Sequence, residues 1–312
     1  MSQLNRREFV GRAAVTAGVV VAGAAVSADP YLPPRNVADK ITLGKTGIKS
    51  SLVGIGTGSV GWNHQSNQTR LGQVKFNELI RHAFDSGIRF FDVADQYGSH
   101  TYLREAIKGL PRDQFVIQSK IVHRTAAEAR ADLERFRKEL GVDYIDTVLM
   151  HVVTEPDWNV RYHGVQEVLE EAKQKGIIRA HGCSCHTIEA LETASNDPWV
   201  EVDLARFNPW GKYMDTKKDQ PEGDTPKYVK PVLQKMRKAG KGVIGMKILA
   251  QGDVLKDLTE VDRAAKARES IKHALSSGAV DMMVIGFESP KQITEVMAQT
   301  QVALNEIHLG IA

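Results

Sequence analysis

Residues 90–98 read Phe-Phe-Asp-Val-Ala-Asp-Gln-Tyr-Gly, and the fold of the chain can be worked out from this stretch. Two aromatic residues that follow Gly87-Ile88-Arg89 predict a short buried strand that ends at Asp92. An ionised carboxylate is costly to bury without a partner, and Tyr97 stands five residues later in the following loop. Both side chains are therefore candidates for a ligand site.

Two later apolar runs end in the same way. Residues 115–120 end on Lys120, and residues 144–151 end on His151. The carboxyl ends of parallel strands share one face of a β/α sheet, and ligands bind at that face. The sequence therefore predicts that the four polar side chains lie close together.

Strands and helices alternate along the rest of the chain. A doubly wound open sheet is the competing arrangement, but the even spacing and the lack of a composition break favour a single (β/α)8 barrel. A small hairpin is expected before it, around 41–50. The expected strands are 52–56, 88–92, 115–120, 144–150, 178–184, 202–207, 243–248 and 281–286, and the expected helices are 73–86, 100–108, 126–140, 163–175, 187–195, 227–239, 263–277 and 290–303.

Composition narrows the class of protein. The chain has 312 residues, of which 42% are hydrophobic, and its net charge of +3 gives no indication of a nucleic-acid partner. Two cysteines are too few for a four-cysteine metal or iron–sulfur site. We expect Cys183 and Cys185 to point to opposite faces of a strand and not to form a disulfide.

The first residues resemble a twin-arginine export signal. Arg6-Arg7 is followed by an uncharged apolar run over 13–26 and by Val26-Ser27-Ala28, where a signal peptidase would cleave. The run is shorter than the ~20 residues that span a bilayer. We expect residues 1–28 to be the signal, 29–40 to be a linker and 41–312 to be the barrel. The resemblance implies contact with the export machinery, an extracytoplasmic location and no stable membrane span after processing.

A glycine motif at residues 56–61 competes with the barrel interpretation. Gly56-Thr-Gly-Ser-Val-Gly61 matches the G-x-G-x-x-G dinucleotide fingerprint and follows a strand. The fingerprint requires a helix to begin there, but polar poor helix formers follow. It also requires an acidic residue at the end of a second strand about 20 residues further on, and Asp92 is too far away to be that residue. We expect a flexible loop at the barrel mouth, with Trp62 and His64 as walls of a substrate pocket.

The four strand-end residues suit carbonyl chemistry. A phenol is a poor proton donor at neutral pH unless its anion is stabilised. Lys120 beside Tyr97 would lower the pKa of the phenol, and Asp92 would keep the lysine charged. His151 would orient a substrate carbonyl by a second hydrogen bond. This set is suited to protonating a carbonyl oxygen while a hydride reaches the carbon, or to the reverse.

These residues are similar to those of the aldo-keto reductase superfamily. The likeness extends over about residues 41–305, and its motifs are Leu43-Gly44-Lys45-Thr46-Gly47, Phe91-Asp92-Val93-Ala94-x-x-Tyr97-Gly98, Ser119-Lys120 and His181-Gly182-Cys183-Ser184-Cys185-His186. It implies that Asp92, Tyr97, Lys120 and His151 are catalytic, with Tyr97 as the acid/base.

The resemblance also implies an extended nicotinamide dinucleotide bound without a Rossmann domain and without a metal. NADP(H) is the family default, and NAD(H) stays open because Gln292 replaces a frequent basic residue and Glu288 would repel a phosphate. Ser184 matches a residue that binds the carboxamide, and Cys185 replaces a common Asn. The expected cofactor contacts are Ser184, Cys185, Met246, Lys247, Gly286, Phe287, Lys291, Gln292 and Glu295.

The substrate is expected to be a small carbonyl or alcohol compound. Its pocket is expected to include Trp62, His64, Trp158 and Trp210. Two other functions remain open. One is a nucleotide-binding regulatory or partner-binding barrel with little turnover, and the other is a non-redox barrel such as an isomerase.

Overall fold

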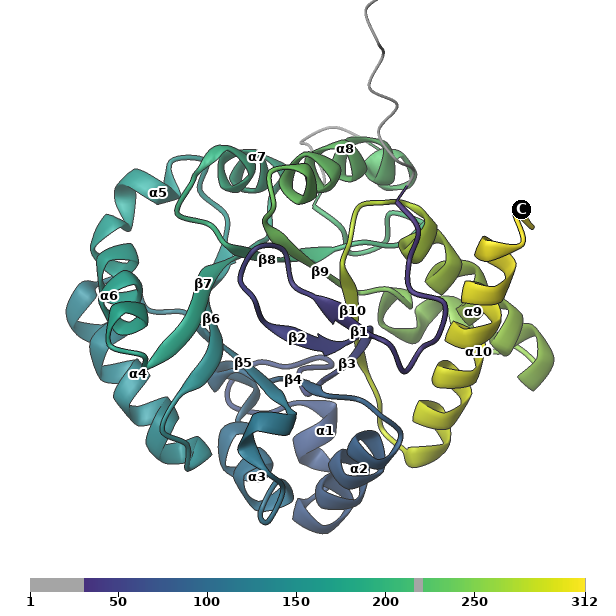
Figure 1. Cartoon of the computed structure of the whole chain (residues 1–312), viewed down its shortest axis with the longest axis horizontal. Coiled ribbons are helices and arrows are strands. Elements are labelled where there is room, and N and C mark those ends of the chain that lie inside the picture. Colours follow the sequence, from purple (N-terminus) through teal and green to yellow (C-terminus); the bar gives the residue numbers. More distant parts are fainter. Residues whose placement is uncertain (1–30, 216–220, 312) are drawn as a thin grey trace, which may run out of the picture. The chain divides into compact units, whose positions relative to one another are not determined.

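A closed barrel of eight parallel strands forms the centre of the protein (Figure 1). The computed structural model describes residues 31–215 and 221–311, so the expected export signal lies outside the described residues. The barrel is confirmed, and the doubly wound sheet is excluded. Around the barrel the strands run β3 (Val53–Gly56), β4 (Phe90–Asp92), β5 (Val116–Ile121), β6 (Ile145–Val153), β7 (Ile178–Cys185), β8 (Val202–Arg206), β9 (Gly242–Met246) and β10 (Met282–Gly286), which pairs with β3.

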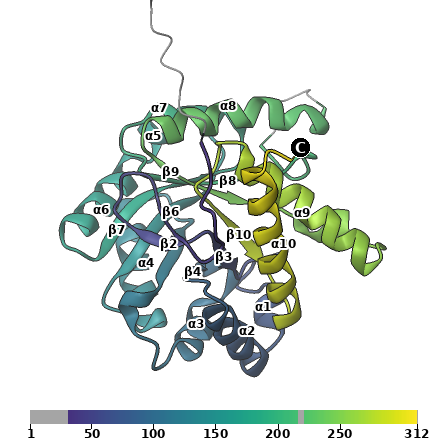
Figure 2. The same cartoon turned by 45° about the vertical axis from the view of Figure 1, so that its right-hand side comes forward.

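Helices surround the barrel, as the alternation of patterns predicts (Figures 1 and 2). Helix α4 shows why they form: Thr125 caps its start, and Gly141 ends it in the left-handed conformation. No helix of the described ranges is long and apolar enough to cross a membrane. The α-helices are α1 (Asn67–Arg70), α2 (Gln73–Asp85), α3 (His100–Ala106), α4 (Ala126–Leu140), α5 (Trp158–Arg161), α6 (His163–Gln174), α7 (Ile188–Asn196), α8 (Thr225–Lys238), α9 (Glu260–Ser276) and α10 (Pro290–His308), and the 3-10 helices are η1 (Asp95–Tyr97), η2 (Arg112–Gln114), η3 (Glu222–Asp224) and η4 (Ala250–Leu255).

The expected hairpin closes one end of the barrel. Strands β1 (Lys40–Thr42) and β2 (Lys49–Ser51) pair antiparallel, and Figure 1 shows them across the barrel opening. Leu43 and Ile48, which lie between the two strands of the hairpin, are fully buried among the apolar side chains that fill the barrel. Gly44 permits this contact, because a Cβ there would lie 2.4 Å from the backbone nitrogen of Gly242. A ligand that reaches the barrel interior therefore has to enter from the other end.

The segment before the hairpin packs against the helices. The Arg237 guanidinium of α8 lies 3.9 Å from the ring centroid of Tyr31. The amide of Val37 donates to Oε1 of Gln301 in α10, at 3.0 Å. The described part of the expected linker, residues 31–40, thus contacts α8 and α10 and ends in the first residue of β1.

Alternation along the strands divides their side chains between two cores. The larger core, called the outer core, lies between the strands and the helices, and the smaller one, called the inner core, fills the barrel. The inner core holds Phe90, Val116, Leu149, Ala180, Val202, Leu204, Ile244, Met282 and Val284. At the carboxyl ends, the inward positions become polar, and this layer of side chains forms the site described next.

Candidate active site

Three strands bring Asp92, Lys120 and His151 to the same end of the barrel interior. Asp92 is the last residue of β4, whereas β5 and β6 continue beyond Lys120 and His151. Asp92 pairs with Gln118, and Lys120 pairs with Leu149 of the inner core. The sequence therefore placed these three residues on the right face, although β5 and β6 both end beyond the residues expected to end them.

Lys120 and Asp92 form a buried ion pair. Lys120 is fully buried, and its Nζ donates to Oδ1 of Asp92 at 2.5 Å and to the carbonyl oxygen of Val93 at 3.1 Å. Gln118 donates to the same carboxylate oxygen at 2.8 Å. Burial lowers the pKa of Lys120, and the charge of Asp92 opposes this shift. Asp92 thus holds a cation beneath the barrel mouth.

Tyr97 lies directly above this ion pair. Its hydroxyl is 3.3 Å from Nε2 of His151, and the ammonium of Lys120 is 4.8 Å from its ring centroid. Burial raises the pKa of Tyr97 well above 10, and the charge of Asp92 raises it further. The expected lowering of this pKa by Lys120 is therefore wrong for the structure, because desolvation outweighs the charge of Arg206, which is the cation that lowers the pKa. The phenol stays protonated at neutral pH, which is the form that can donate a proton.

A strand irregularity sets the position of His151. The register between β6 and β7 shifts between Met150 and Val153, and Val152 has a φ of +55°. Arg124 donates to the carbonyl oxygens of His151 and Val152, at 2.5 and 3.1 Å. Burial, followed by the charge of Lys120, lowers the pKa of His151 well below 6.5, so the imidazole is neutral.

The glycine motif at 56–61 packs against Tyr97. A Cβ on Gly58 would lie 2.4 Å from the phenol ring, and one on Gly61 would lie 2.6 Å from it. No helix begins at the motif, since α1 starts at Asn67. The motif therefore does not form the strand–turn–helix structure of a dinucleotide fingerprint, as expected. Its glycines instead allow the loop after β3 to cover the Tyr97 ring.

Gly58→Ala is expected to lower kcat at least tenfold. The added methyl group overlaps the Tyr97 ring, so the ring has to move away from His151, and small displacements of reacting groups are costly in rate. Steady-state kinetics with any accepted carbonyl substrate measures the effect. The matched control is Gly164→Ala in α6, where the nearest atom would be at 3.4 Å. Equal rates in the two variants would show that the motif does not position Tyr97.

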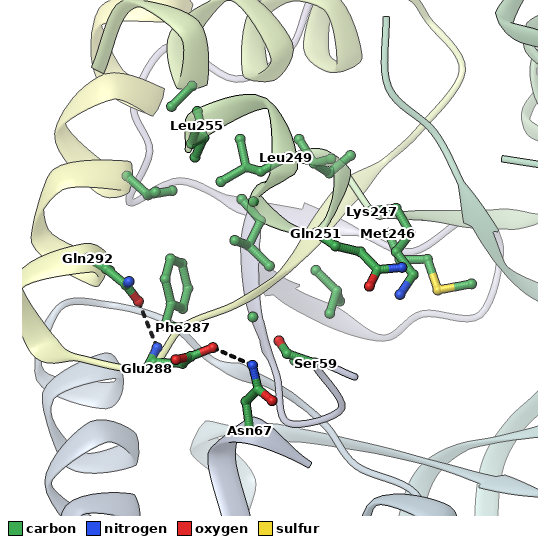
Figure 3. A pocket seen from close by; sticks show the side chains of 18 of the residues that line it. Ser59, Asn67, Met246, Lys247, Leu249, Gln251, Leu255, Phe287, Glu288 and Gln292 are labelled. Atoms are coloured by element: carbon green, nitrogen blue, oxygen red, sulfur yellow. Dashed lines mark hydrogen bonds between the residues drawn. The ribbon is translucent and has the colours of Figure 1, made fainter. Parts of the chain in front are cut away.

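A cavity of about 360 Å³ runs from Asp92 and Tyr97 to the amino-terminal part of α10 (Figure 3). In Figure 3, Met246 and Lys247 lie at one side of it, and Glu288 and Gln292 lie at the other. A Cβ on Gly286 would lie 2.1 Å from Oγ of Ser59, so the glycine leaves room for this side chain from the loop after β3 against the end of β10. An elongated ligand in this cavity would end beside the phenol.

Six of the nine expected cofactor residues line this cavity. Ser184 is fully buried and donates to the carbonyl oxygen of Leu204. Lys291 is not among the lining residues, and its Nζ lies 2.7 Å from Oε1 of Glu260. Cys185 belongs to the core between strands and helices and does not face the cavity. The six lining residues are Met246, Lys247, Gly286, Phe287, Gln292 and Glu295.

The two cysteines lie on the same face of β7, and the opposite expectation is wrong. Their Sγ atoms are 3.6 Å apart, and both thiols are free. Side chains alternate along a strand with a period of two residues, so residues 183 and 185 share a face, and Ser184 takes the other. Cys183 donates to Oδ2 of Asp203 at 3.2 Å. Burial raises the pKa of Cys183 to about 12 and that of Asp203 to about 7.

Asp203→Asn is expected to change how stability depends on pH. The carboxyl group binds its proton more tightly in the folded protein, so the wild type loses stability as pH rises from about 4 to about 7. At ~1.4 kcal/mol per tenfold change in proton affinity, this loss is roughly 4 kcal/mol. Urea unfolding at pH 4.5 and at pH 8 measures the free energy of unfolding of both proteins. Relative to the wild type, the variant should be more stable at pH 8 than at pH 4.5.

Asp146→Asn is the control for this measurement. Asp146 is fully buried as well, but Arg112 and Arg179 each lie 2.7 Å from it. Its substitution should therefore destabilise the protein at pH 8. A constant difference between Asp203→Asn and wild type across this pH range would contradict the assignment.

The four expected pocket walls lie in different surroundings. Trp62 is exposed, and His64 is held by the carbonyl oxygen of Asp95 at 3.0 Å. Trp158 is fully buried and donates to the carbonyl oxygen of Ala190, so it does not reach the barrel mouth. Trp210 lies under the ammonium of Lys266, 4.8 Å from its ring centroid. The expectation for Trp158 is therefore wrong in this structure, because its run after β6 forms α5.

Two polar residues at the mouth were not expected. Arg206 is the last residue of β8, and His186 directly follows β7. The ring centroids of His151 and His186 are 6.2 Å apart. The rule that identified Asp92 and Lys120, a charged residue at a strand end, applies equally to Arg206 and could have revealed it.

Comparison with known proteins places this arrangement in a family. The sequence profile of the Aldo/keto reductase family matches residues 52–270. The chain belongs to the aldo/keto reductase family.

Relatives support this assignment at moderate identity. The chain is similar to "Aldo-keto reductase YhdN" of Bacillus subtilis, with 32% identity over 49% of this chain and 48% of the relative. It is 28% identical to the "NADH-specific methylglyoxal reductase" of Escherichia coli, over 46% of this chain and 51% of that protein. The chain thus spans about half the length of the curated relatives it matches.

A solved structure has the same fold over nearly its whole length. Aldo-keto reductase AKR11C1 from Bacillus halodurans, in its holo form, superimposes with a TM-score of 0.65 at 17% identity. The match covers 86% of this chain and 96% of that chain.

Proposed function

We propose that this protein is an NAD(P)H-dependent oxidoreductase that reduces a small aldehyde or ketone, or oxidises the matching alcohol. One observation carries the proposal: the buried Tyr97 hydroxyl lies 3.3 Å from Nε2 of His151, above the Lys120–Asp92 ion pair and at the end of the elongated cavity. Membership in the aldo/keto reductase family supports it.

Each of the four residues has a separate task in this proposal. Tyr97 gives its proton to the carbonyl oxygen, and the neutral His151 orients that oxygen. The Lys120 cation stabilises the phenolate that forms, and Asp92 keeps the lysine charged and in place. A bound reduced nicotinamide supplies the hydride. The buried site excludes water from the phenol.

The cavity residues fit an extended dinucleotide. Met246 is a polarizable side chain beside the barrel mouth, where a nicotinamide ring would have to lie. Lys247 also lines the cavity, and burial lowers its pKa to about 8, so it offers a positive charge for a pyrophosphate over much of the neutral range. Phe287 and Gln292 line the distant part, where the adenosine would lie.

The charges at the distant end support NAD(H), although NADP(H) is the family default. Glu288 accepts a hydrogen bond from Asn67 at 2.7 Å and lines the cavity, as do Glu260 and Glu295, so these three carboxylates outnumber the guanidinium of Arg263 in the same lining. The ammonium of Lys291 is paired with Glu260 and therefore offers little to a 2′-phosphate. Carboxylates suit the free ribose hydroxyls of NAD(H) and repel the extra phosphate of NADP(H).

Cofactor titration followed by single turnover tests the proposed function. Quenching of protein fluorescence by NADH and by NADPH gives the two dissociation constants, and Glu288→Gln should improve only the affinity for NADPH. Oxidation of the bound cofactor on adding a carbonyl compound then tests the chemistry. Binding without oxidation would favour a regulatory barrel, and no binding of either nucleotide would favour a non-redox barrel.

We also propose that residues 1–28 direct export by the twin-arginine route. Arg6-Arg7 followed by an uncharged apolar run supports this. Replacing both arginines by lysine should keep the protein in the cytoplasm of an expressing bacterium with a functional twin-arginine pathway. An unchanged distribution between the fractions would contradict the proposal.

A further inference from the structure

Three polar side chains that the proposed hydride transfer does not use lie at the barrel mouth. His186 and Arg206 follow or end neighbouring strands, and Asp215 lies on the loop after β8. Arg206 donates to Nδ1 of His186, whose ring meets that of His151 edge-on, with centroids 6.2 Å apart. The charge of Arg206 also influences the pKa values of Tyr97 and His151. His186 is therefore a neighbour of His151, which contacts the proposed proton donor, and Arg206 in turn contacts His186.

The contact with Arg206 fixes the tautomer of His186. A guanidinium can only donate, so Nδ1 of His186 has to accept. Burial, reinforced by the charge of Arg206, lowers the pKa of His186 to about 3, so the ring is neutral. Its single proton is then on Nε2. Within the described part of the chain this N–H has no hydrogen-bond partner, although the atom is buried.

Arg206 is also incompletely paired. Its Nη1 is 3.4 Å from Oδ1 of the fully buried Asp215 side chain, but neither oxygen of Asp215 accepts a hydrogen bond from a described residue. The buried Nε of Arg206 likewise has no acceptor there. Asp146 shows the contrast, because it binds two arginines at 2.7 Å each. Buried donors without partners are costly and indicate a missing acceptor.

We propose that Arg206 and His186 bind a carboxylate that stands next to the reacting carbonyl, so that the substrate is a 2-oxo acid, or a 2-hydroxy acid in the reverse direction. A guanidinium and an N–H donor match the oxygens of a carboxylate. This inference rests on the proposed function, because the carbonyl oxygen has to lie at Tyr97 and His151.

The reaction balances with these groups. The carbonyl carbon of the 2-oxo acid gains a hydride from the reduced nicotinamide, which becomes oxidised. The carbonyl oxygen takes the proton of Tyr97, which solvent later restores. The carboxylate keeps its charge throughout and stays on Arg206. Burial raises the pKa of Asp215 to about 7, so Asp215 is partly protonated at neutral pH and opposes the anion only in part.

The test compares benzoylformate with its methyl ester, which share one ketone skeleton and differ in charge. The wild type is expected to prefer the acid. Arg206→Gln should lower kcat/KM for the acid roughly 10- to 100-fold and for the ester less than threefold, because one charge-assisted contact is lost. Arg130→Gln, at an exposed arginine paired with Glu171, is the control and should leave the preference unchanged.

Asp215→Asn provides an effect of opposite sign. It removes the competing carboxylate, so KM for benzoylformate should fall about two- to tenfold. Equal losses for acid and ester in Arg206→Gln, or turnover of the ester with no preference for the acid, would overturn the inference and leave the proposed function standing.

Binding of oxamate, an unreactive analogue of a 2-oxo acid, tests the site without turnover. Calorimetry on the protein loaded with NADH should show oxamate binding that Arg206→Gln weakens at least tenfold and that Tyr97→Phe retains. Failure of both ketones to react would contradict the proposed function, and the oxamate result would still decide the anion site. Oxamate binding that Arg206→Gln leaves unchanged would overturn the proposed carboxylate site.

Discussion

Tyr97→Phe is expected to lower kcat for carbonyl reduction about a thousandfold or more while cofactor affinity stays within twofold. The substitution removes the hydroxyl that lies 3.3 Å from Nε2 of His151 and leaves the ring that packs under Gly58 and Gly61. General acid catalysis contributes about 10²- to 10⁴-fold in such sites. Stopped-flow oxidation of bound NADH measures the chemical step, and fluorescence titration measures cofactor affinity.

Tyr102→Phe is the matched control for this experiment. Tyr102 packs against Phe76 in the outer core, with ring centroids 5.3 Å apart, and lies outside the residues that line the cavity. Its hydroxyl should be dispensable for catalysis. Full turnover in Tyr97→Phe would refute the role of the phenol as proton donor.

Breaking the Lys120–Asp92 pair is expected to cost both stability and activity. Lys120→Met leaves the Asp92 carboxylate buried without its cation, and Asp92→Asn leaves the Lys120 ammonium without its anion. Removing one partner of a buried pair typically costs about 3–5 kcal/mol. Urea unfolding measures this loss, and each single variant should also lose most of its turnover.

The double variant separates the two effects. Lys120→Met combined with Asp92→Asn removes both charges, so its stability should be higher than the sum of the two single losses predicts. Its activity should not return, because no cation remains to stabilise the phenolate. The exposed pair Arg130–Glu171 is the control, and its disruption should cost little stability because solvent screens both charges. Strictly additive losses at Lys120 and Asp92 would argue against a coupled pair.

Local sequence patterns were sufficient to predict the barrel and the centre of the site. Each strand carries its own apolar run, and the carboxyl ends of parallel strands share one face, so Asp92, Lys120 and His151 could be brought together without coordinates. The glycine motif could be rejected on the same basis, because the residues after it are poor helix formers. These inferences use neighbouring residues and one general property of parallel sheets.

Properties that depend on packing could not be predicted in this way. The pKa of Tyr97 rises because the ring is buried under a loop from another strand, whereas the sequence shows only a nearby lysine. Trp158 enters the outer core because the chain after β6 turns into α5. The error at Cys183 and Cys185 was different in kind, since strand periodicity alone would have placed both thiols on one face.

Because Cys183 and Cys185 lie on the same face of β7, their reaction with thiol reagents can report local unfolding of the barrel at this strand. Both thiols are fully buried, and their raised pKa values leave almost no thiolate while the wall is closed. Alkylating reagents should therefore modify them only when β7 separates from the overlying helices, at a rate that follows the opening equilibrium. Ser184 lies between them on the opposite face of the same strand. A ligand that stabilises β7 from inside the barrel should therefore slow the labelling of the two thiols. Separation of β7 from its helices can thus be measured by labelling the two native cysteines, without any substitution.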